Sequence, residues 1–149
     1  AVVLATAGLC RLGYGERITA RFTLDELIPA CGQGALALQC RTEDAKTTAR
    51  LAQLADRATT LSVAAERAFN TRLGGSCHTP LGALARWQAE SGALHIRGFV
   101  GSVDGARLLH GERSGQVVTQ AHAQALGREL AEVLLSQGAQ ALLQGAAQG

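Results

Sequence analysis

The spacing of hydrophobic residues changes near residue 80, from a helical period to an alternating one. From residue 56 to about residue 73, apolar side chains recur every three or four positions, which predicts a helix with Asp56 as its N-cap. Its polar residues, among them Glu66 and Arg67, lie mostly on the other sides of that helix. Three short runs then alternate between apolar and polar residues and predict strands at 81–87, 93–100 and 107–115. A second helix is predicted from Thr119 to Gln137, followed by one more turn after Gly138.

This order of a helix, three short strands and a helix predicts an α+β fold. The strands are separated by turn residues at 89–92 and 102–105, and the Asp104-Gly105 pair favours a hairpin. Hairpin-connected strands are antiparallel, and helices that flank them bury their apolar stripe against one face of the sheet. We therefore expect a C-terminal domain with a three-stranded antiparallel sheet and helices on one face.

The first 55 residues show no pattern that closes a core of its own. We expect a helix over residues 1–12, a short strand at 17–22 and a second helix from Glu43 to about Leu54. A glycine-hinged loop at 31–34 precedes an apolar run at 35–40, which predicts a buried strand. Because no partner strands for this run are evident, we expect incomplete pieces of α/β domains, cut from a longer chain.

Composition excludes several classes of function. The chain has 149 residues and a formal net charge of +2, which offers no basic field for nucleic acid. It contains no run of about 18 apolar residues, so we expect no membrane span. The four cysteines have neither the spacing of a metal knuckle nor that of a secreted disulfide framework, which predicts no metal site and a reducing, cytoplasmic setting. The thirteen arginines and single Lys46 fit either a GC-rich genome or carboxylate binding.

Residues 74–80 place a lone thiol, Cys77, in a glycine-rich turn after the first long helix. Glycine allows backbone conformations that other residues avoid and lets a bulky group approach, while Pro80 prevents the helix from resuming. Cys77 could carry a group covalently, or it could be a small residue beside a C-cap glycine. His78 is its neighbour, but adjacent side chains in an extended segment point apart, which disfavours a cysteine–histidine nucleophilic pair.

Four stretches in this order resemble the porphobilinogen deaminase family, also called hydroxymethylbilane synthases. They are Ala7-Gly8-Leu9-Cys10-Arg11-Leu12-Gly13, Pro29-Ala30-Cys31-Gly32-Gln33-Gly34-Ala35, Ala65-Glu66-Arg67-Ala68-Phe69-Asn70-Thr71-Arg72-Leu73, and the Cys77 loop. The resemblance covers essentially the whole chain. It implies that residues 1–30 end the second domain, that residues 31–55 return to the first, and that residues 56–149 form the cofactor-attachment domain. The loop departs from the family's common Glu-Gly-Gly-Cys by reading Gly-Gly-Ser-Cys.

The resemblance also implies a chemistry. The family is a transferase that joins porphobilinogen units into hydroxymethylbilane with loss of ammonia, on a dipyrromethane primer that a thioether would attach to Cys77. It implies that Arg11, Arg67 and Gln33 bind carboxylates or pyrroles of the cofactor and the growing chain, and that the catalytic aspartate lies upstream. We expect no catalytic residue in this chain, an inactive fragment, and the remainder of the enzyme as its partner.

Other interpretations of these residues remain open. Arg11 could stabilise a helix C-terminus, Arg67 could form a structural ion pair, and Gln33 could close a loop at a domain crossover. A carrier or interaction domain with a structural cysteine is the alternative function, and an unrelated cysteine hydrolase is a third.

Overall fold

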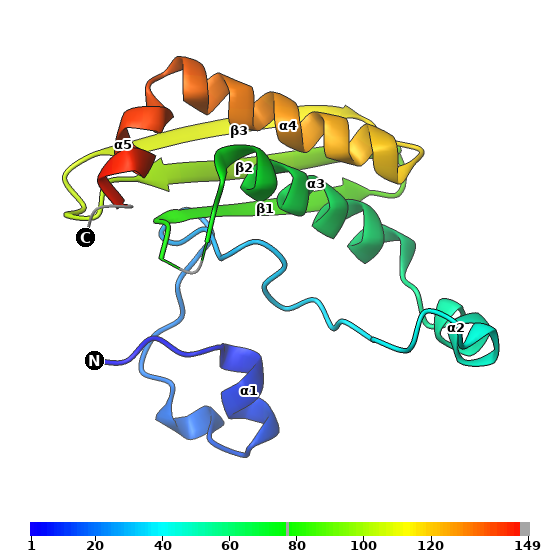
Figure 1. Cartoon of the computed structure of the whole chain (residues 1–149). Helices are drawn as coiled ribbons and strands as arrows, with labels where there is room; N and C mark the ends of the chain where they lie inside the picture. The colour runs from blue at the N-terminus through cyan, green and yellow to red at the C-terminus, as the bar shows by residue number, and fades with distance from the viewer. Residues whose placement is uncertain (77, 147–149) are drawn as a thin grey trace.

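The computed structural model describes residues 1–76 and 78–146, and their C-terminal part forms two layers (Figure 1). One layer is an antiparallel sheet of order β1-β2-β3, formed by β1 (Leu81–Gln88), β2 (Ala93–Gly101) and β3 (Leu108–Gln116). The other layer consists of α3 (Arg57–Leu73), α4 (Gln120–Ser136) and α5 (Ala139–Ala146). The predicted α+β fold, with three antiparallel strands and helices on one face, is confirmed.

Local sequence explains where the two long helices begin and end. The Asp56 carboxylate accepts a hydrogen bond from the Thr59 amide at 2.7 Å, and the Thr119 hydroxyl accepts one from His122 N at 3.2 Å. Both side chains satisfy a helix amide that has no partner within the helix. Gly74 ends α3 with φ +69°, a conformation that glycine adopts without strain.

The core lies between the sheet and the helices. Alternate residues of β2, including Leu94, Ile96 and Val100, are fully buried against the helical layer. Phe69 of α3 is also fully buried and lies over Gly98, where an added Cβ would meet the Phe69 ring at 2.8 Å. Glycine at residue 98 therefore makes room for the largest side chain of the core.

The N-terminal part is mostly extended and contains only short helical segments. These are α1 (Thr6–Arg11), the 3₁₀ turn η1 (Gly15–Arg17) and α2 (Ala45–Ala52), so the predicted helices over 1–12 and 43–54 are present but shorter. The strand predicted at 17–22 is wrong, because the chain there follows η1 without joining a sheet.

The buried strand predicted at 35–40 is also wrong. The segment is extended but joins no sheet, and the Leu36 side chain is 87% exposed. An apolar run becomes a buried strand only when neighbouring strands accept its backbone hydrogen bonds, and the described residues supply none here. Among the helices that the structure describes, none is long and apolar enough to cross a bilayer.

One stretch of the N-terminal part, residues 25–34, lies against the C-terminal sheet. The Asp25 carboxylate accepts a hydrogen bond from Arg97 Nη1 of β2 at 2.8 Å. At Gly82 of β1, an added Cβ would meet the Pro29 carbonyl oxygen at 2.6 Å, so glycine permits this close approach. The Cys31 side chain then packs against the hydrophobic core.

Candidate functional site

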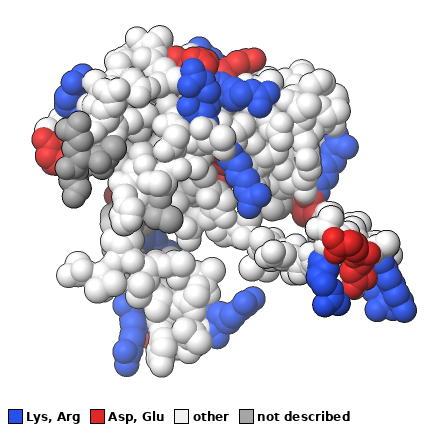
Figure 2. All heavy atoms as spheres, viewed as in Figure 1, with Lys and Arg blue, Asp and Glu red and all other residues white. Residues whose placement is uncertain are grey.

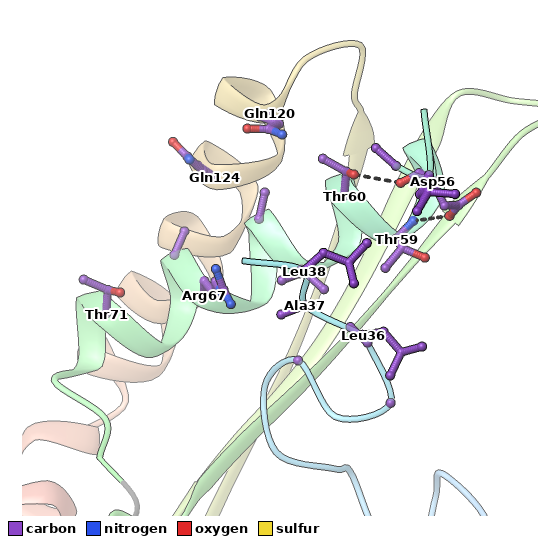
Figure 3. A pocket seen from close by; sticks show the side chains of 18 of the residues that line it. Leu36, Ala37, Leu38, Asp56, Thr59, Thr60, Arg67, Thr71, Gln120 and Gln124 are labelled. Atoms are coloured by element: carbon purple, nitrogen blue, oxygen red, sulfur yellow. Dashed lines mark hydrogen bonds between the residues drawn. The ribbon is translucent and has the colours of Figure 1, made fainter. Parts of the chain in front are cut away.

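A groove of about 1220 Å³ follows the face of α3 that points away from the sheet (Figure 3). Leu36, Ala37 and Leu38 of the extended segment form one side, and Gln120 and Gln124 of α4 form the other. More of the described lining residues are apolar or hydroxyl-bearing than charged. A groove of this size and composition has room for a small organic ligand.

Guanidinium groups supply most of the charge in this groove. Arg67 and Arg72 of α3 and Arg128 of α4 all line it, and basic side chains are visible on this side of the molecule in Figure 2. Arg72 forms an ion pair with Glu132 at 2.5 Å. Neither Arg67 nor Arg128 has an ion pair or a side-chain hydrogen bond within the described residues. These two can therefore bind carboxylates, because guanidinium groups match carboxylate oxygens with paired donors.

Gln33 lies beside this groove in a tight turn formed by residues 31–34. Its neighbours Gly32 and Gly34 line the groove and have φ values of +77° and +83°, which glycine tolerates and other residues rarely adopt. The Gln33 amide donates to the Ala30 carbonyl at 3.0 Å, while its side chain is exposed. The structure therefore brings the predicted residues Arg67 and Gln33 to the same region.

Arg11 is placed elsewhere. It is exposed in the last turn of α1, and in Figure 1 α1 lies apart from the sheet and its helices. Arg11 does not line the groove that contains Arg67. The described residues alone do not bring these two arginines together.

Cys77 lies outside the described residues, but the structure describes its neighbours. The Ser76 amide donates to the Thr79 hydroxyl at 2.9 Å, and the Thr79 amide donates to the Ser76 carbonyl at 3.1 Å. Ser76 and His78, on either side of Cys77, are both exposed. The loop follows Leu73, the last residue of α3, and Thr71 and Arg72 in the last turn of that helix line the groove.

A buried carboxylate, Glu66, is the feature that sequence reasoning placed incorrectly. We expected Glu66 on a side of the helix away from the core, but it is only 4% exposed. Its Oε2 accepts a hydrogen bond from the Gly32 amide at 2.6 Å, and its Oε1 accepts one from the Ala85 amide at 2.8 Å. Burial raises the pKa of Glu66, and the hydrogen bonds from Ala85 and Gly32 oppose that rise. The signal was present, since Glu66 precedes Phe69 by three positions and therefore shares its helical face.

The four aspartates all have structural partners. Asp25 pairs with Arg97, Asp44 and Asp56 accept hydrogen bonds from amides at helix N-termini, and Asp104 accepts them in the β2–β3 turn. Backbone and side-chain hydrogen bonds from Thr47 and Thr59 lower the pKa of Asp44 and Asp56, and those from Ser102 and Ala106 lower the pKa of Asp104. In the described part of the chain, no three histidine, cysteine, aspartate or glutamate residues cluster as a metal site.

Comparison with known proteins identifies the family. The family model described as "Porphobilinogen deaminase, C-terminal domain" matches residues 60–136, which is more than half of the chain. The chain belongs to the porphobilinogen deaminase family. A second model of that family, described as "Porphobilinogen deaminase, dipyromethane cofactor binding domain", matches residues 1–49.

Individual relatives agree with this assignment to the porphobilinogen deaminase family. The porphobilinogen deaminases of Burkholderia mallei (strain SAVP1) and Burkholderia pseudomallei (strain 668) are each 46% identical to this chain over 143 residues. The matched region covers 96% of this chain and 43% of either relative, so the chain spans less than half the length of these proteins.

The groove fits the kind of group that this family binds. A dipyrromethane is an aromatic, apolar body that carries several carboxylates. The groove offers apolar walls from Leu36, Leu38 and Ala64 together with the guanidinium groups of Arg67 and Arg128. Its residues are therefore suited to hold such a group.

Proposed function

We propose that this chain is part of a transferase that polymerises porphobilinogen into the linear tetrapyrrole hydroxymethylbilane, with loss of one ammonia per unit. We further propose that Cys77 carries the dipyrromethane primer through a thioether. Family membership over nearly the whole chain is the observation that carries the proposal. The groove with its guanidinium groups and the exposed residues on either side of Cys77 support it.

The bound dipyrromethane supplies the pyrrole carbon to which new units are added. Arg67 binds carboxylates of the primer or the growing chain, because its guanidinium group faces the groove and has no partner in the described part of the protein. Gln33 donates hydrogen bonds from the adjacent turn. Arg11 has the same role as Arg67 once the remainder of the enzyme brings α1 to the site.

The remainder of the same enzyme is the proposed partner of this chain, and we propose that residues 1–149 alone are inactive. The relatives are more than twice as long as the matched region. Each of the four aspartates has a structural partner, which supports placing the proton-handling aspartate elsewhere in the enzyme. The division into residues 1–30, 31–55 and 56–149 is part of this proposal. So is a cytoplasmic location, which the free thiols of Cys10, Cys31 and Cys40 support.

Turnover measurements test this function. In the protein as its genome encodes it, we expect porphobilinogen consumption with release of ammonia, and we expect Cys77→Ser to abolish it. Cys40→Ser is the matched control, because the side-chain hydrogen bond that the described residues give Cys40 is to the Thr48 hydroxyl, at 3.5 Å, and a serine can keep it. Residues 1–149 alone should show no turnover. Full activity of Cys77→Ser would contradict the thioether, whereas a wild-type protein without turnover would favour a carrier or interaction domain with a structural cysteine.

A further inference from the structure

Glu66 joins two segments that are far apart in the sequence. Its carboxylate accepts hydrogen bonds from Gly32, 34 residues upstream, and from Ala85, 19 residues downstream. Ala85 belongs to β1, an edge strand whose other side pairs with β2. One buried side chain of α3 therefore holds both the glycine turn and the free edge of the sheet.

We propose that Glu66 is a positioning residue that fixes the turn carrying Gln33 relative to the helix that presents Arg67. Its role in substrate binding rests on the proposed function. Gly32 directly precedes Gln33, and Glu66 directly precedes Arg67. Successive residues of an α-helix are about 100° apart, so Glu66 points into the protein while Arg67 faces the groove.

The turn needs such a contact because its own backbone is permissive. Gly32 and Gly34 both have positive φ values, and glycine loses more conformational freedom on ordering than any other residue. The described hydrogen bonds within the turn are backbone contacts, Gln33 N to Ala30 O at 3.0 Å and Ala35 N to Gly32 O at 3.1 Å. A charged acceptor at 2.6 Å from the Gly32 amide adds a stronger contact from outside the turn.

The geometry also explains why a carboxylate occupies this buried position. Each of its two oxygens has one amide donor, so both donors are satisfied by a single side chain. A glutamine would present one carbonyl oxygen and one NH₂ group, and that NH₂ group would face an amide donor. Glu66→Gln therefore removes one of the two hydrogen bonds while it changes the side-chain volume very little.

The test uses the protein as its genome encodes it, with Glu66→Gln, Glu66→Asp and the control Glu129→Gln. Glu129 is an exposed residue of α4 that does not line the groove. By hydrogen–deuterium exchange, we expect the Gly32 or the Ala85 amide to exchange at least about tenfold faster in Glu66→Gln, with the core amides of β2 unchanged. In steady-state kinetics we expect KM for porphobilinogen to rise about tenfold and kcat to change less than about twofold, since misplacement weakens binding.

Each result decides a separate point. Unchanged exchange at both amides would overturn the contact itself, whatever the activity. Faster exchange with an unchanged KM would show that the contact holds the turn but does not position Gln33 and Arg67 for substrate. If Glu66→Gln fails to fold, Glu66→Asp supplies the same two measurements, because the shorter acid cannot reach both amides. A wild-type protein without turnover would contradict the proposed function and leave the exchange measurement as the test of the contact.

Discussion

Residues 56–146 and residues 1–55 both contain many apolar side chains, but only the C-terminal part buries them. All the fully buried apolar side chains in the described residues lie between Leu61 and Leu142. By contrast, among the residues whose burial the structure describes, ten of the thirteen strongly exposed large apolar side chains lie in the first 55 positions, from Val2 to Leu54. The C-terminal part therefore contains the hydrophobic core, whereas the N-terminal part has apolar surface suited to contacts with other chain segments.

The two parts differ in how they satisfy the hydrogen-bonding groups of their backbones. In the C-terminal part, β2 pairs on both sides, and α3 and α4 cover one face of the sheet. In the N-terminal part, the segment at 35–40 is extended but has no strand beside it. Hydrophobic residues alone do not make a core, because the backbone between them also needs hydrogen-bond partners.

The largest predicted difference in stability is between alanine substitutions at Phe69 and at Leu36. Phe69→Ala removes a fully buried ring and should lower the free energy of unfolding by about 3–5 kcal/mol. Leu36→Ala changes a side chain that is 87% exposed, so it should alter the free energy of unfolding by less than about 0.5 kcal/mol. Urea unfolding of residues 1–149 measures both. Equal losses would mean that the two parts share one core.

The cost of Leu36→Ala in residues 1–149 can also be compared with its cost in the complete protein. If upstream strands pair with residues 35–40, Leu36 becomes buried there, and the substitution should cost about 2–5 kcal/mol. A cost that stays near zero in both proteins would contradict the proposal that residues 31–55 belong to the first domain of the enzyme.

Thiol labelling should show where the C-terminal layer protects a residue of the N-terminal part. Burial raises the pKa of Cys31 to about 11, with a further contribution from the nearby Glu66 charge. At pH 8 this lowers the thiolate fraction, so alkylation by iodoacetamide should be on the order of 100-fold slower than for an unhindered cysteine. Peptide mass spectrometry can compare Cys31 with Cys10, which is exposed. Equal rates for the two would show that the turn does not pack on the core.

Two helical glycines offer a matched pair with a smaller effect. An added Cβ at Gly127 of α4 would collide with the Ala65 carbonyl oxygen of α3, so Gly127→Ala should cost about 1–3 kcal/mol by separating the helices. At Gly8 of α1 an added Cβ meets nothing within 4 Å, and Gly8→Ala should leave the main unfolding transition unchanged. Thermal unfolding followed by circular dichroism distinguishes the two. A destabilising Gly8→Ala would show that α1 contributes to the core.

The smallest predicted effect is a pH dependence that originates from Glu66. Burial raises its pKa above the ordinary value of 4.5, so the folded state holds this proton more tightly than the unfolded state does. This contribution to stability is complete below pH 4.5 and is lost as pH rises through the raised pKa. Cys31 is the titratable neighbour, and it stays neutral in this range. Urea unfolding from pH 4 to pH 7 should therefore show a decline in the stability of the wild-type protein that Glu66→Gln lacks. Parallel stability profiles of the two proteins would contradict this role of Glu66.

Most of the C-terminal fold could be predicted from the sequence, because its signals are local. Asp56, Thr119 and the Asp104-Gly105 turn mark element boundaries by chemistry within a few residues. The strand predicted at 35–40 is wrong because an apolar run forms a strand only beside a partner, and a local pattern does not show whether a partner is present. Helical periodicity places Glu66 on the face of Phe69, but it does not reveal the two amide donors, which come from segments 34 and 19 residues away.

The residues of the candidate site also differ in how well the sequence locates them. Arg67 and the turn around Gln33 could be located from the resemblance, and the structure places both beside the groove. Arg11 lies apart because α1 buries none of its residues and its main contacts are with η1. Its predicted role depends on the remainder of the enzyme.

Mass spectrometry of the peptide around Cys77 tests the central claim most directly. Trypsin cleaves after Arg72 and Arg86, so residues 73–86 form one peptide that contains a single cysteine. From the protein as its genome encodes it, we expect this peptide to carry the added mass of two linked pyrroles with their acetate and propionate groups, and to lose that mass in Cys77→Ser. An unmodified thiol in a preparation that turns over porphobilinogen would contradict the account.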